Sequence, residues 1–272
     1  MNEKQLQLEV YRVFDSKLKK LAESRGINSK NLNKYFSPHK ENTSPLYYLC
    51  VSLQNSGIMR NSIKFSEKGD YHNYIKEATF NFDANKTVSH YKKWQDLYNK
   101  VKKLGVKDNG KGKNTNWTKY CKGIYEGSKY LVKDNGIQEI NNLTKVNVLT
   151  DKELKTITSI SKKIHGIGFA LTCDWLKEYG CTWLAKPDTH IIDIVACMNS
   201  AITKEKDIMK YMSNWANIIK QSGVDKKMTA YKLDKMIWLL CTENFYLDSI
   251  GGKRDMLKEI NKCKLRLDKK RI

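Results

Sequence analysis

The sequence predicts a mainly α-helical protein. Its apolar residues recur mostly three or four positions apart, the spacing of one helix face, and strict alternation typical of strands is scarce. Only three prolines interrupt the chain. With 272 residues it is long enough to bury one or two cores of ordinary size. We therefore expect a chain that folds by itself, as a monomer.

The charge balance favours a polyanionic partner. Basic residues exceed acidic ones by 21, and such an excess attracts nucleic acid and accelerates encounter with it. The excess is nearly all lysine, however, and the chain is also rich in Asn and Ile. An AT-rich coding sequence produces this composition whatever the function. The charge is thus compatible with nucleic-acid binding without establishing it.

Other classes of protein find little support. The charge-free apolar run from Met236 to Cys241 is far shorter than the roughly 20 residues of a membrane span. The opening MNEKQLQLEV lacks the apolar stretch of a signal peptide, so a cytoplasmic protein is expected. The seven cysteines form no CxxC pair, which indicates free thiols rather than a zinc or iron–sulfur site.

The first informative helix begins at Ser44. Ser44 and Pro45 form a cap and first-turn pair, and Gly57 supplies a stop. The leucines between them share one face: Leu46, Leu49 and Leu53. Gln54 and Asn55 then lie at the C-terminal end of this helix.

A second helix begins at Thr150, which stands at capping-box spacing from Glu153. Its apolar face runs through Leu154, Ile157, Ile160 and Ile164. Gly166, Ile167 and Gly168 follow, and a third helix is expected over about 169–179. The sequence therefore predicts a helix, a glycine hairpin and another helix.

Two explanations fit this hairpin. Glycines bring backbone N–H groups close to a ligand, and the start of a helix favours an anion such as phosphate. Alternatively, Gly166 and Gly168 make a tight turn that only packs Ile167 inward.

Asp188 lies near the start of a further helix, because Ile191, Ile192 and Val195 turn into a core beyond it. An aspartate after a proline is commonly a simple N-cap. A carboxylate at the positive end of a helix also stays ionised, which suits a group that faces developing positive charge. Both roles are compatible.

The segment KKIHGIGFALTCDWLKEYGCTWLAKPDTHIIDIV, residues 162–195, resembles the signature of the helix-hairpin-helix DNA glycosylase superfamily, which includes endonuclease III. The spacing from hairpin to aspartate agrees with that family, and its DTHI phrase is retained here from Asp188 onward. Two departures stand out. His165 occupies a position where proline is usual, and Ala170 occupies the position where lyase-competent relatives carry lysine.

The resemblance implies a two-lobed helical fold over 1–272 with the active site in the cleft between the lobes. The hairpin lobe is expected over about 44–200, and residues 1–30 and 201–272 are expected to form the second lobe. Residues 61–91 are ambiguous and could be a short sheet, an insertion or irregular helix, and residues 105–116 are expected to form a loop. Together, residues 61–117 are a possible insertion and loop.

The resemblance also assigns roles. Asp188 is the expected catalytic residue, and Gln54 and Asn55 are expected to fill the gap left by a flipped base. The hairpin residues expected to bind the DNA backbone are His165, Gly166, Ile167, Gly168, Phe169 and Ala170. Carbonyls between Ile164 and Ile167 could hold a monovalent cation, and no iron–sulfur cluster is expected.

A base pocket needs aromatic faces. Trp183, in the loop before Asp188, is the first candidate, followed by Tyr47, Trp175 and His190. An aromatic residue at helical spacing is more often core, which applies to Trp175, and His190 also suits packing. No catalytic metal is expected, because Asp188 and Asp193 do not share a helix face.

The expected activity is therefore hydrolytic release of a base from double-stranded DNA, which leaves an abasic site. Two alternatives stay open. One is a DNA-binding protein without catalysis, and the other is a glycosylase with lyase activity from a displaced lysine, with Lys162, Lys163 and Lys186 nearby. The base is not identified: oxidised, alkylated, deaminated and hypermodified bases all fit, in repair or in defence.

Overall fold

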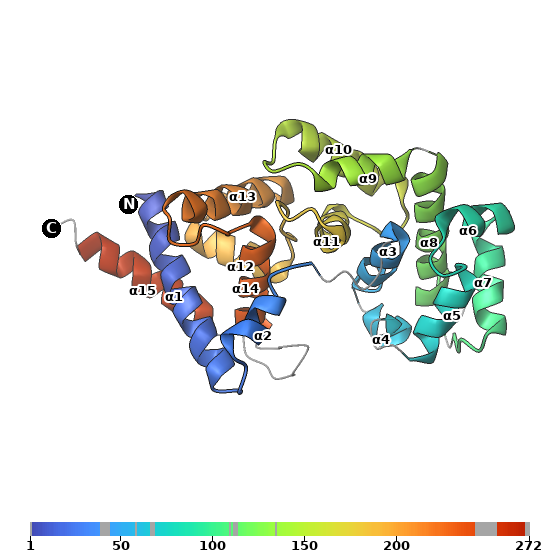
Figure 1. Cartoon of the computed structure of the whole chain (residues 1–272), viewed down its shortest axis with the longest axis horizontal. Helices are drawn as coiled ribbons and strands as arrows, with labels where there is room; N and C mark the ends of the chain where they lie inside the picture. The colour runs from blue at the N-terminus through green and yellow to red at the C-terminus, as the bar shows by residue number, and fades with distance from the viewer. Residues whose placement is uncertain are drawn as a thin grey trace. The chain divides into compact units, whose positions relative to one another are not determined.

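Helices make up all the regular structure in the described part of the chain, as Figure 1 shows. The computed structural model describes residues 2–38, 44–57, 59–65, 69–108, 110, 114–133, 135–242 and 255–269. The predicted α-helical class is confirmed. No described helix combines the length and the hydropathy needed to span a bilayer.

The chain divides into two compact units, each described here by itself. Unit 1 is Met1–Pro38, Asn147–Leu149 and Cys181–Ile272, and unit 2 is His39–Val146 and Thr150–Gly180. This division differs from the expected lobes, because residues 181–200 belong to unit 1. The physical reason is that the helix of this segment packs against later helices of unit 1.

Unit 1 contains six described helices: α1 (Glu3–Glu23), α2 (Ser29–Lys34), α12 (Thr189–Met198), α13 (Glu205–Gln221), α14 (Ala230–Thr242) and α15 (Asp255–Lys269). Helix α1 packs against α13, α14 and α15. Phe14 and Trp215 join α1 to α13 in the core, with ring centroids 6.2 Å apart. The indole N–H of Trp215 also donates to the carbonyl of Gln7 at 2.9 Å.

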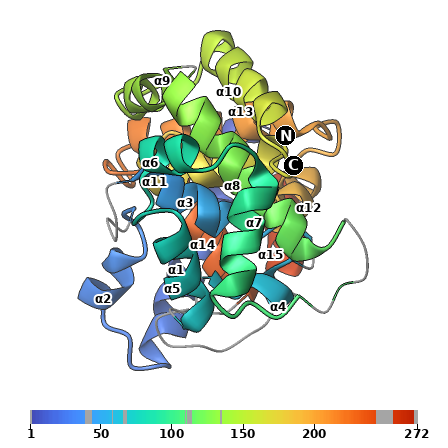
Figure 2. The same ribbon diagram turned by 90° about the vertical axis from the view of Figure 1, so that its right-hand side faces the viewer.

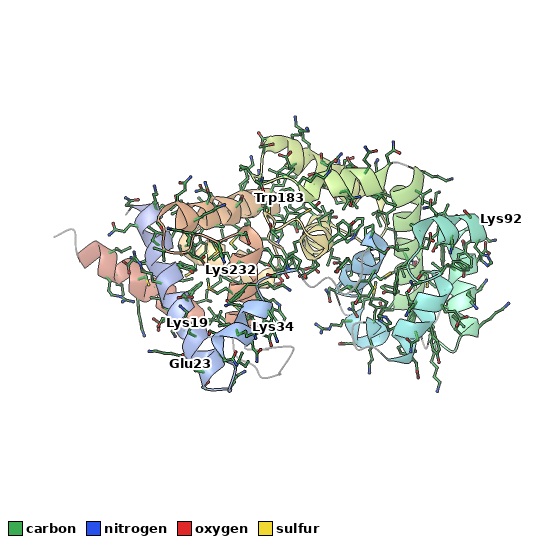
Figure 3. The ribbon with its side chains drawn as sticks, viewed as in Figure 1. Lys19, Glu23, Lys34, Lys92, Trp183 and Lys232 are labelled. Atoms are coloured by element: carbon green, nitrogen blue, oxygen red, sulfur yellow. The ribbon has the colours of Figure 1, made fainter. Side chains whose placement is uncertain are left out.

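Asp225 ties three parts of unit 1 together. It lies between α13 and α14 and accepts from the Tyr11 hydroxyl of α1 at 3.2 Å. The Lys232 ammonium of α14, labelled in Figure 3, donates to the same oxygen at 2.5 Å. Burial raises the pKa of Asp225, but the hydrogen bond and charge of Lys232 outweigh it and leave this pKa below its ordinary value.

Unit 2 contains nine described helices: α3 (Pro45–Leu53), α4 (Arg60–Ile63), α5 (Asp70–Ala78), α6 (Ala84–His90), α7 (Trp94–Lys103), α8 (Asn116–Lys133), α9 (Gly136–Thr144), α10 (Asp151–Lys163) and α11 (Phe169–Tyr179). Helix α8 is the central element, because it packs against α3, α6 and α7 and also contacts α9 and α10. Figure 2 shows α8 beside α7.

Where it is described, the segment 61–117 contains helices α5, α6 and α7, most of α4 and the start of α8, joined by turns and loops, and it forms no sheet there. Its irregular apolar spacing has a local cause, since Phe80, Asn81 and Phe82 all adopt left-handed backbone conformations, with φ of 52°, 61° and 62°. Three such residues in a row interrupt the helical period. Parts of the predicted loop 105–116 lie outside the described residues.

Two glycines let neighbours approach α8 closely. A Cβ on Gly127 would lie 2.0 Å from Leu49 Cδ2 of α3. A Cβ on Gly123 would lie 2.8 Å from the carbonyl oxygen of His165, which belongs to the hairpin. The hairpin backbone therefore rests directly on α8 at Gly123.

Gly123→Ala tests this close approach. Alanine is the better helix former, yet its methyl group would push against a backbone carbonyl, so we expect a net loss of about 1–2 kcal/mol in the free energy of unfolding. Urea denaturation followed by circular dichroism measures it. Lys119→Ala, at an exposed position of the same helix, should leave the midpoint nearly unchanged. Equal stability of both variants would contradict the account.

The Asp225 contacts predict a pH dependence. A carboxyl whose folded-state pKa lies below its unfolded value stabilises the fold above the unfolded pKa, and this contribution is lost as pH falls through the folded pKa. We expect Asp225→Asn to cost about 1 kcal/mol at pH 7, a difference that shrinks below about pH 4. Asp15→Asn is the control, because its pair with Lys19 is exposed. A difference independent of pH would contradict this prediction.

Candidate nucleic-acid interface

The hairpin between α10 and α11 forms as the sequence predicts. Thr150 and Glu153 make the capping box of α10, which ends at Lys163. Gly166 has φ of +79°, a conformation that favours glycine. The predicted helix-hairpin-helix is thus confirmed as local structure.

Gly168 has a different reason to be glycine. Its φ of −85° is open to any residue, and a Cβ built on it would meet nothing within 4 Å. Neither the backbone nor a neighbour in the protein requires a glycine there. A bare backbone facing open space is what the close approach of a ligand needs. Ile167 between the two glycines is buried, 3 % exposed, so packing and ligand approach are compatible.

The start of α11 offers donors to such a ligand. Gly168 is the N-cap residue and has no side chain to accept from the first turn. The first amides of a helix have no acceptor within the helix, and Phe169 and Ala170 occupy these positions. The Thr172 hydroxyl donates to the Gly168 carbonyl at 2.9 Å and so fixes the turn. An anion is the natural partner of these amides.

A carboxylate holds the hairpin from the other side. The backbone N–H of His165 donates to Glu126 Oε2 of α8 at 2.8 Å. A proline at position 165 would have no N–H to satisfy, so the histidine creates a donor and Glu126 supplies its acceptor. Sequence reasoning missed Glu126, because it lies 39 residues from its partner.

Next to this contact is a pocket of about 510 Å³ that we call the lysine pocket. It is lined by Glu126, Lys129, Tyr130, Lys133 and Lys163. The Lys163 ammonium lies 5.4 Å from the centre of the Tyr130 ring. Three lysines against one carboxylate favour an anion beside the hairpin. The spacing of Glu126, Lys129 and Lys133, three and four residues apart and therefore on one face of a helix such as α8, was the signal available in the sequence.

Asp188 is the N-cap of α12 in unit 1, as predicted. Its Oδ1 accepts from the backbone N–H groups of His190 at 3.1 Å and Ile191 at 3.3 Å. Its Oδ2 lies 3.9 Å from the ammonium of Lys186, and the Asp188 side chain is 22 % exposed. The cap leaves Oδ2 facing a cation at the positive end of a helix.

The two amide residues after α3 have different surroundings. Gln54 is buried, only 1 % exposed, so the structure does not present it at the surface where the wedge role was expected. Asn55 is half-buried and donates to Asp174 Oδ2 at 3.3 Å. Asp174 pairs in turn with the buried Lys177 at 3.4 Å. Of the two expected wedge residues, Asn55 is the more accessible.

The aromatic candidates do not form one group. Trp175 is fully buried, and its indole N–H donates to the carbonyl of Pro45 at 2.8 Å, so it is a core residue of unit 2. Tyr47 is also core, packed edge-on against Phe82 at 5.1 Å. This corrects both expectations of a base-pocket role, because Tyr47 of α3 and Trp175 of α11 are buried in the unit. Trp183 is buried but lines a cavity of unit 1, in which His190 has no part.

Metal ligands are not grouped in the described part of the chain: no three His, Cys, Asp or Glu residues there are placed to hold an ion. Each of the seven cysteines is a free thiol. Burial raises the pKa of the Cys181 thiol to about 12. The expected cation at the carbonyls of Ile164 to Ile167 remains a prediction.

No protein-family model matches the chain, and no curated protein matches it. Among solved structures, the chain is similar to the crystal structure of the 8-oxoguanine DNA glycosylase of Thermotoga maritima, with a TM-score of 0.45 and 15 % identity over 88 % of this chain and 97 % of that chain.

The contact between Glu126 and His165 gives a sharp test. Glu126→Ala leaves the His165 N–H without its acceptor, and we expect duplex DNA to bind about threefold to tenfold more weakly. Glu126→Gln keeps an acceptor and removes a negative charge, so it should bind at least as tightly as the wild type. Fluorescence anisotropy with a labelled duplex at fixed salt measures both.

The control is a second change at the donor. Ile164 has the extended conformation, φ −121° and ψ 124°, that a residue before proline adopts. His165→Pro should therefore be accommodated, and in that background Glu126→Ala should no longer weaken binding. Tighter binding by the single alanine variant would mean that only the charge of Glu126 matters and would refute the positioning role.

Proposed function

We propose that this protein is a DNA N-glycosylase that flips a damaged or modified base out of double-stranded DNA and removes it by hydrolysis. The observation that carries the proposal is Gly168: a glycine that nothing in the protein requires, at the start of a helix whose first amides have no acceptor within the helix. A backbone phosphate fits these donors and leaves the base sequence unread.

The lysine pocket supports this assignment. Lys129, Lys133 and Lys163 stand beside the hairpin and add charge for the neighbouring phosphates of the same strand. Such contacts position a duplex without selecting its sequence. The positive net charge of the chain then speeds the encounter with DNA.

Asp188 is the residue we propose for catalysis. When the bond between base and sugar breaks, its electron pair leaves with the base and positive charge develops on the sugar. The capped Asp188 carboxylate would stabilise that charge, and a water would add to the sugar carbon and lose its proton. The products are the free base and an abasic site in an intact strand. Ala170, at the position of the lyase lysine in similar proteins, favours water as the nucleophile.

Lys186 favours a second candidate function, a glycosylase that also cleaves the strand. Its ammonium lies 3.9 Å from Asp188 Oδ2, and its backbone N–H is held by Asp234 at 3.4 Å. An amine that loses its proton can attack the sugar carbon and form a Schiff base, which leads to strand cleavage. Borohydride reduction would then link enzyme and DNA covalently, and Lys186→Ala would abolish that link.

The direct test is base release from a panel of duplexes with oxidised, alkylated, deaminated and hypermodified bases. We expect one class to be released, with strands intact until alkali is added. Asp188→Asn should lower the rate by about 100-fold or more, because it removes the charge but keeps a good N-cap.

Circular dichroism melting of the same variant controls for folding. If no duplex releases a base, and if DNA binding is sensitive to salt and unchanged in Asp188→Asn, the proposal is wrong. The protein would then be a DNA-binding protein without catalysis. Strand breaks before alkali would favour the role of Lys186.

A further inference from the structure

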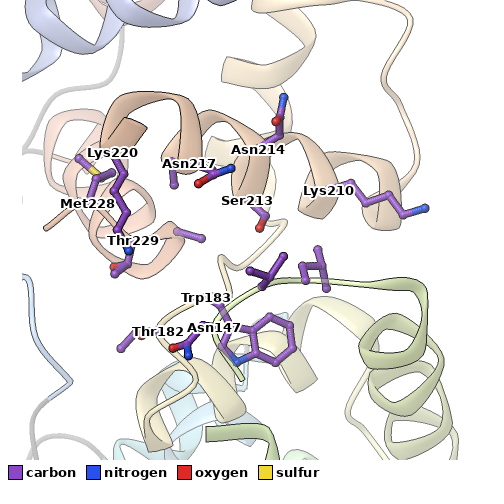
Figure 4. Close-up of a pocket in the computed structure, with 14 residues that line it drawn as sticks. Asn147, Thr182, Trp183, Lys210, Ser213, Asn214, Asn217, Lys220, Met228 and Thr229 are labelled. Atoms are coloured by element: carbon purple, nitrogen blue, oxygen red, sulfur yellow. The ribbon is translucent and has the colours of Figure 1, made fainter. Parts of the chain in front are cut away.

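A separate cavity of about 280 Å³ lies wholly within unit 1. It is enclosed by one face of α13, the segment Asn147–Leu149, the loop after α11 and the residues just before and at the start of α14, as Figure 4 shows. None of the hairpin residues lines it, and neither does Asp188. The proposed catalytic and phosphate-binding residues thus leave this cavity without a role.

The floor of the cavity is apolar. It is made by Trp183, Ala216, Met228 and Ala230, which are 2–5 % exposed. Val148 adds an apolar wall and is 67 % exposed, unusual for a valine. Such a floor favours a ligand with a flat, weakly hydrated face.

The rim is different in kind. Three asparagines and a serine also line the cavity: Asn147, Ser213, Asn214 and Asn217. In Figure 4 the Asn214 amide points away from Trp183. These four side chains make no hydrogen bond to another described residue. Each amide offers both a donor and an acceptor, so together they can match the polar edges of a heterocycle.

The positive charge of the lining lysines favours an anionic ligand. Lys210 and Lys220 line it at two positions of α13, and no aspartate or glutamate is among its lining residues. Both lysines are exposed. In Figure 4 the ammonium of Lys220 lies beside Thr229, so it can reach a ligand in the cavity, whereas the Lys210 side chain extends away from it. An ammonium acts on phosphate as a mobile point charge.

We propose that this cavity binds a nucleotide, with the base on the apolar floor and at the amides and the phosphate at Lys220. A phosphate alone would not need the floor, and an apolar ligand would leave the amides and lysines unused. The nucleotide is either a free nucleoside monophosphate or one residue of a single strand. The proposal does not depend on the glycosylase activity, because Asp188, the hairpin and the lysine pocket lie outside this cavity.

Isothermal titration of the full chain tests the site. The probes are the four deoxynucleoside monophosphates, a ten-residue single-stranded oligonucleotide and inorganic phosphate. Asn217→Ala and Lys220→Ala, both at exposed positions, should each weaken nucleotide binding by about tenfold. The matched controls are Asn33→Ala and Lys20→Ala, exposed residues of unit 1 outside the cavity. They should leave binding unchanged, as should Asp188→Asn.

Binding of a monophosphate that depends on Asn217 and Lys220 would support the site with a free nucleotide as its ligand. Binding of the oligonucleotide alone, with the same dependence, would support it with a single strand. Three results would overturn it: no binding of either probe at millimolar concentration, phosphate binding as tightly as the nucleotides, or equal effects of the cavity variants and their controls.

Discussion

The hairpin depends on how closely its backbone rests on α8. Gly123 leaves room for the carbonyl of His165, and Glu126, one turn further along the helix, accepts from the N–H of the same residue. One face of α8 therefore fixes both polar groups of one hairpin residue. With that residue fixed, Ile167 is buried while Gly168 faces open space. The geometry that suits a phosphate follows from this contact.

The sequence predicts best what is decided locally. Ser44, Thr150 and Asp188 accept from amides two or three residues away, so a short stretch of sequence specifies each helix start. The hairpin is equally local. The segment 61–91 was ambiguous because Phe80–Phe82 breaks the helical period, and the helix that follows it at Ala84 has a signal only in Asp83.

Contacts between distant residues could not be predicted in the same way. An aromatic residue at helical spacing is more often core than pocket, but only the packing of α3 and α11 shows that Tyr47 and Trp175 are core. The contact of Glu126 with His165 joins residues 39 apart. The cavity at Trp183 combines segments that are separated by more of the chain still, so the sequence identified the tryptophan without the asparagines around it.

The central claim is that the backbone N–H groups in the first turn of α11, which have no acceptor within the helix, bind the DNA backbone. Amide chemical shifts, recorded while a short duplex is titrated into the full chain, test it most directly. The account predicts that the amides of Gly166, Gly168, Phe169 and Ala170 shift together, and that added salt reverses the shifts. Unchanged hairpin amides, with shifts confined to other parts of the chain, would contradict it.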